Sequence, residues 1–136
     1  MLTEHTAIFR LRVDDHVMIA HSLAGEFFGP AQNLHGATLA ITATFERQGL
    51  DEHGVVMDIG VATQLLSEVL EPLRYQNLDE HPDFAEKIST TEVICQHIAL
   101  QLASALPEGH GLQALEVAAE EHPRARGMVR IELSPA

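Results

Sequence analysis

Apolar and polar residues alternate in four separate stretches of the chain, a pattern typical of β-strands with one solvated face. The four predicted strands cover residues 9–21, 37–45, 115–119 and 129–133. In the first of them, a bulge at Asp14-Asp15 would change which side chains share a face. The last two flank the short turn segment EEHPRARG, and we expect them to form a β-hairpin.

Two stretches between these pairs of strands carry apolar residues at helical spacing instead. The first covers residues 62–73, with Pro72 near its end. The second begins at Ser89-Thr90-Thr91-Glu92, which has the spacing of a capping box with Ser89 at the N-cap. Residues 22–36 hold three glycines and one proline, and they predict a long loop.

The order strand, strand, helix, helix, strand, strand predicts an α+β fold. Such segregated runs favour two helices on one face of a four-stranded antiparallel sheet. We expect residues 1–136 to form a single domain. A four-stranded sheet leaves two open edges, and pairing with neighbouring subunits is one way to protect them.

Composition and charge narrow the classes of partner. The 136 residues include 8 Lys and Arg against 20 Asp and Glu, for a net charge of −12, which disfavours binding to nucleic acid or an anionic membrane. The sequence has neither a signal-peptide pattern nor an apolar run long enough to span a membrane. Cys95 is the only cysteine, so no internal disulfide forms, and we expect a cytoplasmic protein. Nine histidines raise the question of a metal site.

Six short motifs, in this order, resemble the 6-pyruvoyl tetrahydropterin synthase family, which includes the 6-carboxytetrahydropterin synthases. They are AHSL, NLHGA, VVMDIG, LRYQNLD, STTE and LEVAAEE, and the resemblance covers roughly residues 5 to 130. It implies the T-fold, in which three subunits close a β-barrel and two trimers stack into a homohexamer. Such a ring would also protect the open sheet edges.

The resemblance implies a zinc ion held by three histidines, and this chain matches two of them. His21 and His35 take the first two positions, whereas the third position is Ala37, which cannot ligate a metal. Two protein ligands would hold zinc weakly. We therefore expect no zinc cofactor and interpret the two histidines as a remnant pair. His16 could replace the third ligand if the first strand has a bulge, and His122 could do so if the third strand extends that far.

The residues that the resemblance assigns to proton transfer are also replaced. Residues 29–31, near the position of the family's catalytic cysteine, are Gly-Pro-Ala, and the family's Asp-His pair is Arg74-Tyr75. None of these is a good base or nucleophile at neutral pH. Cys95 is expected to pack inside the second helix as a small apolar residue. Arg74 and Tyr75 are instead expected near the ligand, where Arg74 could hold a carboxylate or phosphate.

The pterin-binding residues implied by the resemblance are largely retained. Glu120 takes the place of the glutamate that accepts hydrogen bonds from the guanidine-like edge of the pterin ring, with Glu121 as the alternative if the register differs by one. Thr90, Thr91 and Glu92 match residues that line the pocket. Glu120 could equally be an exposed strand carboxylate, and helix capping alone could explain the STTE segment.

Three functions are compatible with these observations. The leading one is a pterin-binding homologue without zinc or synthase activity, its ligand held between subunits, where Phe27 and Phe28 could stack on a flat ring. The alternative is an active lyase of the 6-carboxytetrahydropterin synthase type, acting on dihydroneopterin triphosphate or a related pterin with a rebuilt metal site. A third is a structural or partner-binding hexamer with an inactive pocket.

Overall fold

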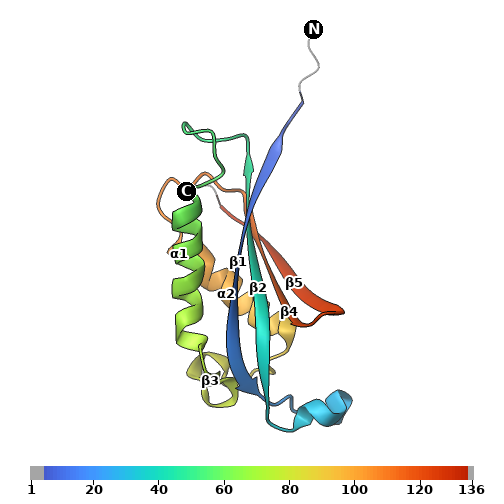
Figure 1. The fold of residues 1–136 in the computed structure, drawn as a ribbon. Helices are drawn as coiled ribbons and strands as arrows, with labels where there is room; N and C mark the ends of the chain where they lie inside the picture. Colours follow the sequence, from blue (N-terminus) through green and yellow to red (C-terminus); the bar gives the residue numbers. More distant parts are fainter. Residues whose placement is uncertain (1–4, 135–136) are drawn as a thin grey trace.

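The computed structural model describes residues 5–134, which form a five-stranded sheet with two helices on one face (Figure 1). The strands are β1 (Ile8–His21), β2 (His35–Gln48), β3 (Gln76–Asn77), β4 (Ala114–His122) and β5 (Ala125–Glu132), in the sheet order β3-β1-β2-β4-β5. The helices are α1 (Ile59–Leu70) and α2 (Thr91–Ala105). The α+β prediction is confirmed, and so are the four main strands and the hairpin between β4 and β5.

The prediction of a purely antiparallel four-stranded sheet is wrong in one respect. β3 is a fifth strand of only two residues, and it runs parallel to β1 opposite Ile19 and Ala20. The backbone N–H of Tyr75 donates a hydrogen bond to the carbonyl of Met18 just before this pairing begins. Two residues are too short to produce an alternating pattern, so the sequence carried no signal for this strand.

β1 and β2 pair without interruption along their whole length. Ile8 lies opposite Gln48 and His21 lies opposite His35, and the register does not change between these ends. The bulge considered at Asp14-Asp15 is therefore absent from β1. Because side chains alternate across a strand, His21 shares the helix-covered face with the core residue Val17.

The core lies between that face of the sheet and the two helices. α1 packs on β1, and α2 packs on β4 and β5. Fully buried side chains from the sheet and both helices include Leu39, Phe45, Leu66, Ile98, Leu102 and Val117. Burial of this apolar surface is the main favourable term that holds the helices on the sheet.

The helix boundaries differ in detail from the prediction. Thr90, and not Ser89, is the N-cap of α2, and its hydroxyl oxygen accepts a hydrogen bond from the Val93 N–H at 3.2 Å. Ser89 is buried instead against His21. α1 begins earlier than expected, because the Asp58 side chain caps it by accepting from the Val61 N–H at 2.9 Å.

Four short 3-10 helices lie between the main elements. They are η1 (Glu26–Gln32), η2 (Glu71–Leu73), η3 (Leu78–Glu80) and η4 (Pro82–Phe84). η1 occupies the predicted loop and projects from the end of the sheet where β1 ends and β2 begins (Figure 1).

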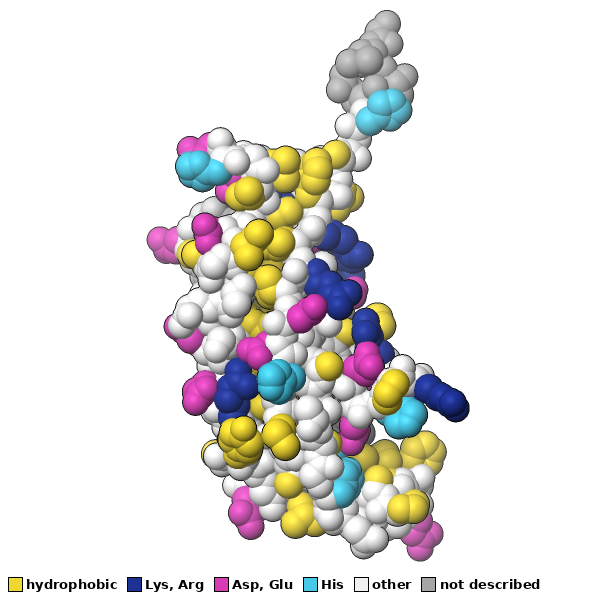
Figure 2. All heavy atoms as spheres, in the orientation of Figure 1, with side chains coloured by type: hydrophobic (Ala, Val, Ile, Leu, Met, Phe, Trp, Pro, Cys, Tyr) yellow, Lys and Arg dark blue, Asp and Glu magenta, His cyan; other side chains and the backbone are white. Residues whose placement is uncertain are grey.

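Figure 2 shows basic and acidic side chains interspersed over the visible face. No helix within residues 5–134 is long and apolar enough to cross a membrane.

The helix-free face of the sheet carries a buried carboxylate. Glu46 is 6% exposed and accepts hydrogen bonds from Arg130 at 2.7 and 2.8 Å, from Gln113 at 2.7 Å and from Arg10 at 3.1 Å. These donors, Arg130 first among them, lower the pKa of Glu46 to about 2. The network links β1, β2 and β5 across the face opposite to the helices.

Glu46→Gln is expected to lower the free energy of unfolding by about 2 kcal/mol at neutral pH, because it leaves two arginines without their shared carboxylate. The pKa of Glu46 falls from an ordinary value of 4.5 to about 2 on folding, so the stabilisation is complete above pH 4.5 and is lost as the pH falls toward 2. Urea unfolding at pH 7 and at pH 3 measures both effects.

The matched control is Glu132→Gln, which removes a carboxylate that also binds Arg130 but is 75% exposed. Its effect should be much smaller. Equal losses in the two variants, or a Glu46→Gln effect that does not shrink at low pH, would contradict this account.

Candidate metal and ligand site

Two histidine side chains face each other where β1 ends and β2 begins. His21 and His35 are paired across the two strands, and their ring centroids are 4.6 Å apart. The His21 side chain is 2% exposed, and that of His35 is 32% exposed. The uninterrupted β1–β2 register places both rings on the helix-covered face of the sheet.

Backbone carbonyl groups orient both rings. Nδ1 of His21 lies 2.9 Å from the Ser89 carbonyl oxygen, and Nδ1 of His35 lies 2.8 Å from the Asn33 carbonyl oxygen. A carbonyl oxygen only accepts hydrogen bonds, so each Nδ1 must carry the proton. In the neutral ring, Nε2 then holds a lone pair. Nε2 of His21 is buried and has no hydrogen-bond partner among the described residues.

A carboxylate completes this cluster. Glu121 Oε1 lies 3.8 Å from Nε2 of His21 and 3.8 Å from Nε2 of His35. One potential ligand atom from each of these three residues lies within 4.8 Å of the other two. The expected remnant pair therefore has a third potential ligand, which sequence reasoning considered only as an alternative pterin anchor. Alternation from Leu115 through Val117 would have placed Glu121 on this face.

The other residues considered as a third ligand lie elsewhere. His16 points to the opposite face of β1, and its side chain is 71% exposed. His122 is the exposed last residue of β4, where it lines the larger cavity and its Nδ1 accepts a hydrogen bond from the Arg124 N–H at 3.2 Å. Ala37 shares the face of His35 and contributes only a methyl group there.

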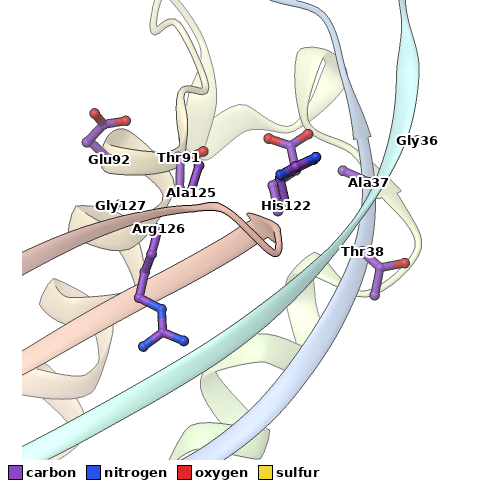
Figure 3. A pocket seen from close by; sticks show the side chains of 10 residues that line it. Gly36, Ala37, Thr38, Thr91, Glu92, His122, Ala125, Arg126 and Gly127 are labelled. Atoms are coloured by element: carbon purple, nitrogen blue, oxygen red, sulfur yellow. The ribbon is translucent and has the colours of Figure 1, made fainter.

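Two adjoining cavities open beside the cluster. The first, of about 450 Å³, is lined by His21, Phe28, Thr90, Thr91, Glu92 and Glu121, among others. The second, of about 600 Å³, lies between the start of β2, the start of α2 and the β4–β5 hairpin (Figure 3). Thr91, Glu92 and Glu121 line both cavities, and Thr90 lines the smaller one. The predicted pocket residues Thr90, Thr91 and Glu92 therefore lie together beside the histidines.

A close approach between α2 and β5 shapes this region. A Cβ atom added at Gly127 would lie 2.8 Å from Thr91 Cγ2, which is shorter than any ordinary contact between carbon atoms. The missing side chain at Gly127 lets the first turn of α2 rest on the hairpin. This contact fixes the position of Thr91 and Glu92 at the cavity wall.

The structure does not bring Glu120 to this site within one chain. Glu120 lies on the helix-free face, where Arg126 Nη2 donates a hydrogen bond to its Oε2 at 2.7 Å. Neither of the two cavities includes Glu120 in its lining. The carboxylate that occupies the histidine face of β4 is its neighbour, Glu121.

Arg74 and Tyr75 also lie outside both cavities. The Arg74 guanidinium group donates hydrogen bonds to Asp15 Oδ2 at 3.0 Å, to the His16 carbonyl at 2.8 Å and to Glu71 Oε2 at 3.1 Å. These contacts attach the end of η2 to the middle of β1. Tyr75 is 80% exposed and adopts a φ of 58°, a backbone conformation uncommon for a residue with a side chain.

The remaining candidates divide between core and surface. Cys95 is buried in α2, and this burial raises the pKa of its thiol to about 11, so it packs as predicted and is not an available nucleophile. Phe27 and Phe28 both line the smaller cavity, and Phe27 is 93% exposed on η1. Figure 2 shows apolar side chains at the lower right of the molecule, where η1 lies in Figure 1.

A comparison with protein-family models identifies one family. The family model described as 6-pyruvoyl tetrahydropterin synthase matches residues 10–132. A solved 6-pyruvoyl tetrahydropterin synthase from Caenorhabditis elegans is 22% identical, with a TM-score of 0.77 over 97% of this chain and 100% of that chain. One from Plasmodium vivax is 18% identical, with a TM-score of 0.78 over 93% and 99%. The comparison with curated proteins finds no match.

An uncharacterised protein from Wolinella succinogenes has the same fold, with 14% identity and a TM-score of 0.69 over 93% of this chain and 99% of that chain. Identities this low show the fold alone. The T-fold implied by the six sequence motifs is therefore confirmed. One chain contributes an open sheet to it, so closure into a barrel by several chains stays a prediction.

Proposed function

Because the chain belongs to the 6-pyruvoyl tetrahydropterin synthase family, we propose that it binds a pterin-like heterocycle in the paired cavities beside His21 and His35. The observation that carries this proposal is the convergence of Thr90, Thr91 and Glu92, which the sequence motifs assign to the pocket, on cavities of about 450 and 600 Å³. Volumes of this size are typical of small-molecule sites.

The cavity walls suit a flat ring with hydrogen-bond donors along one edge. Phe28 supplies an aromatic surface, and Thr90 and Thr91 supply hydroxyl groups. Glu92 lies in the first turn of α2 and lines both cavities. A carboxylate accepts two adjacent N–H groups in a bidentate, charge-assisted pair. We assign this role to Glu92, because Glu120 is bound to Arg126 on the opposite face of the sheet.

The family's synthase reaction is not part of this proposal. The positions that the resemblance assigns to proton transfer hold Arg74 and Tyr75, and Arg74 is engaged with Asp15 and Glu71. Cys95 is buried and protonated at neutral pH, since the pKa of its thiol is raised to about 11. Cys95 therefore offers no replacement for the missing cysteine at the cavity.

The assembled protein is proposed to be a homohexamer, a dimer of trimers, with the ligand bound between subunits. Within residues 5–134, the outer edge of β5 and most of the outer edge of β1 have no partner strand. Edge pairing between copies would satisfy their backbone groups. It would also bring the exposed Tyr75 of one chain close to another chain. A cytoplasmic location fits the single reduced thiol.

One observation favours the alternative function, an active lyase with a rebuilt metal site. Glu121 adds a third potential ligand to the two histidines, as a catalytic metal site requires. This alternative needs a proton donor and acceptor from outside the family's pattern. Turnover of a pterin substrate, and not metal content, therefore distinguishes the lyase from the leading proposal.

Neopterin and 6-carboxypterin are expected to bind saturably in a fluorescence titration of the assembled protein. Glu92→Gln should weaken binding at least tenfold, because it removes one charge-assisted pair. The matched control, Glu120→Gln, should bind like the unmodified chain. No binding of either compound would refute the proposal, and loss of binding in Glu120→Gln alone would reassign the anchor to Glu120.

Incubation of the metal-loaded protein with dihydroneopterin triphosphate is expected to leave the substrate unchanged, because the cavity lacks the family's cysteine and Asp-His pair. Liquid chromatography of the pterins checks this outcome. Release of triphosphate together with a new pterin, in proportion to protein concentration, would instead support the lyase.

A further inference from the structure

We propose that His21, His35 and Glu121 bind one divalent transition-metal ion of the zinc type. In this site the carboxylate of Glu121, on β4, replaces the imidazole that Ala37 on β2 cannot supply. The proposal stands independently of the pterin ligand, because it rests only on the three side chains and the groups that orient them. It replaces the expectation of an inactive remnant pair.

The two rings already have the protonation that metal binding requires. The Ser89 and Asn33 carbonyl oxygens accept from Nδ1–H of His21 and His35, at 2.9 and 2.8 Å. Histidines that bind a metal usually donate their other N–H to such a group, which sets the tautomer and the ring orientation. Both Nε2 lone pairs are therefore available on the side of Glu121.

Burial supplies an independent observation. The His21 side chain is 2% exposed, and its Nε2 has no hydrogen-bond partner among the described residues. A buried polar atom without a hydrogen-bond partner carries an uncompensated desolvation cost and calls for an explanation. A metal ion bound to this atom removes that cost. Glu121 Oε1 lies 3.8 Å from it, which is too far for a hydrogen bond but close enough to share an ion.

The donor set indicates the class of metal. Two neutral imidazoles and one carboxylate suit Zn²⁺ and Co²⁺ better than Mg²⁺ or Ca²⁺, which prefer oxygen ligands. Two histidines and one glutamate also form a known type of catalytic zinc site, with a fourth position left open. His21 and Glu121 line the smaller cavity, so an open position would face the ligand space. A metal there supplies Lewis acidity toward a ligand oxygen.

The neighbouring glutamate provides a matched control. Glu120 and Glu121 are adjacent on β4, carry the same charge and lie on opposite faces of the sheet. Glu121→Gln removes a ligand, whereas Glu120→Gln makes the same chemical change outside the site. His35→Gln removes the ligand that is easiest to replace without disturbing the core, because the His35 side chain is 32% exposed.

The experiment is a titration of chelator-stripped protein with Zn²⁺ in competition with a chromophoric chelator, and with Co²⁺ followed by its visible d–d absorption. The unmodified chain and Glu120→Gln should bind one ion per chain with equal affinity. Glu121→Gln and His35→Gln should each bind at least tenfold more weakly and alter the Co²⁺ spectrum. Far-UV circular dichroism confirms that each variant is folded.

Three results would overturn the proposal. They are no Zn²⁺ or Co²⁺ binding by the folded, unmodified protein, an unchanged affinity in Glu121→Gln, and an equal loss in Glu120→Gln. Because no pterin is present, failure here is separate from failure of the proposed ligand, which is tested through Glu92.

Discussion

The continuous antiparallel register between β1 and β2 is the constraint on which the rest of the site depends. It runs from Ile8 opposite Gln48 to His21 opposite His35. A shift of one residue would turn every side chain of β1 to the other face. His21 would then leave the buried side of the sheet. His16 would lie on that side instead, but five residues farther along β1 and out of reach of His35. Fourteen paired residues thus hold two imidazole rings in contact.

The segment that begins α2 connects this strand pair to the ligand space. Ser89 accepts the His21 Nδ1–H through its carbonyl, Thr90 caps the helix, and Thr91 and Glu92 line the cavities. Four consecutive residues therefore orient a histidine, start a helix and form a cavity wall. Since Gly127 lets this segment rest on β5, a change at any of these positions affects the histidine and the cavity together.

Strong periodic patterns predicted most of the fold, whereas features that depend on one or two residues were not predicted. Alternation located the main strands, and helical spacing located both helices, because each pattern extends over many residues. The two-residue β3 has no such pattern. The choice of Thr90 over Ser89 as the cap depends on a long-range contact with His21 that a sequence read locally does not reveal. The choice between Glu120 and Glu121 depends on strand parity, which a motif match does not resolve but alternation from Leu115 does.

The central claim is that the fold holds both histidines with Nε2 free to bind a metal. Long-range ¹H–¹⁵N correlation spectra of the imidazole side chains test it directly, with single His→Gln substitutions to assign the signals. In metal-free protein at a pH where the rings are neutral, the account predicts that both His21 and His35 carry their proton on Nδ1, because each donates to a backbone carbonyl. A proton on Nε2 of either ring would contradict it.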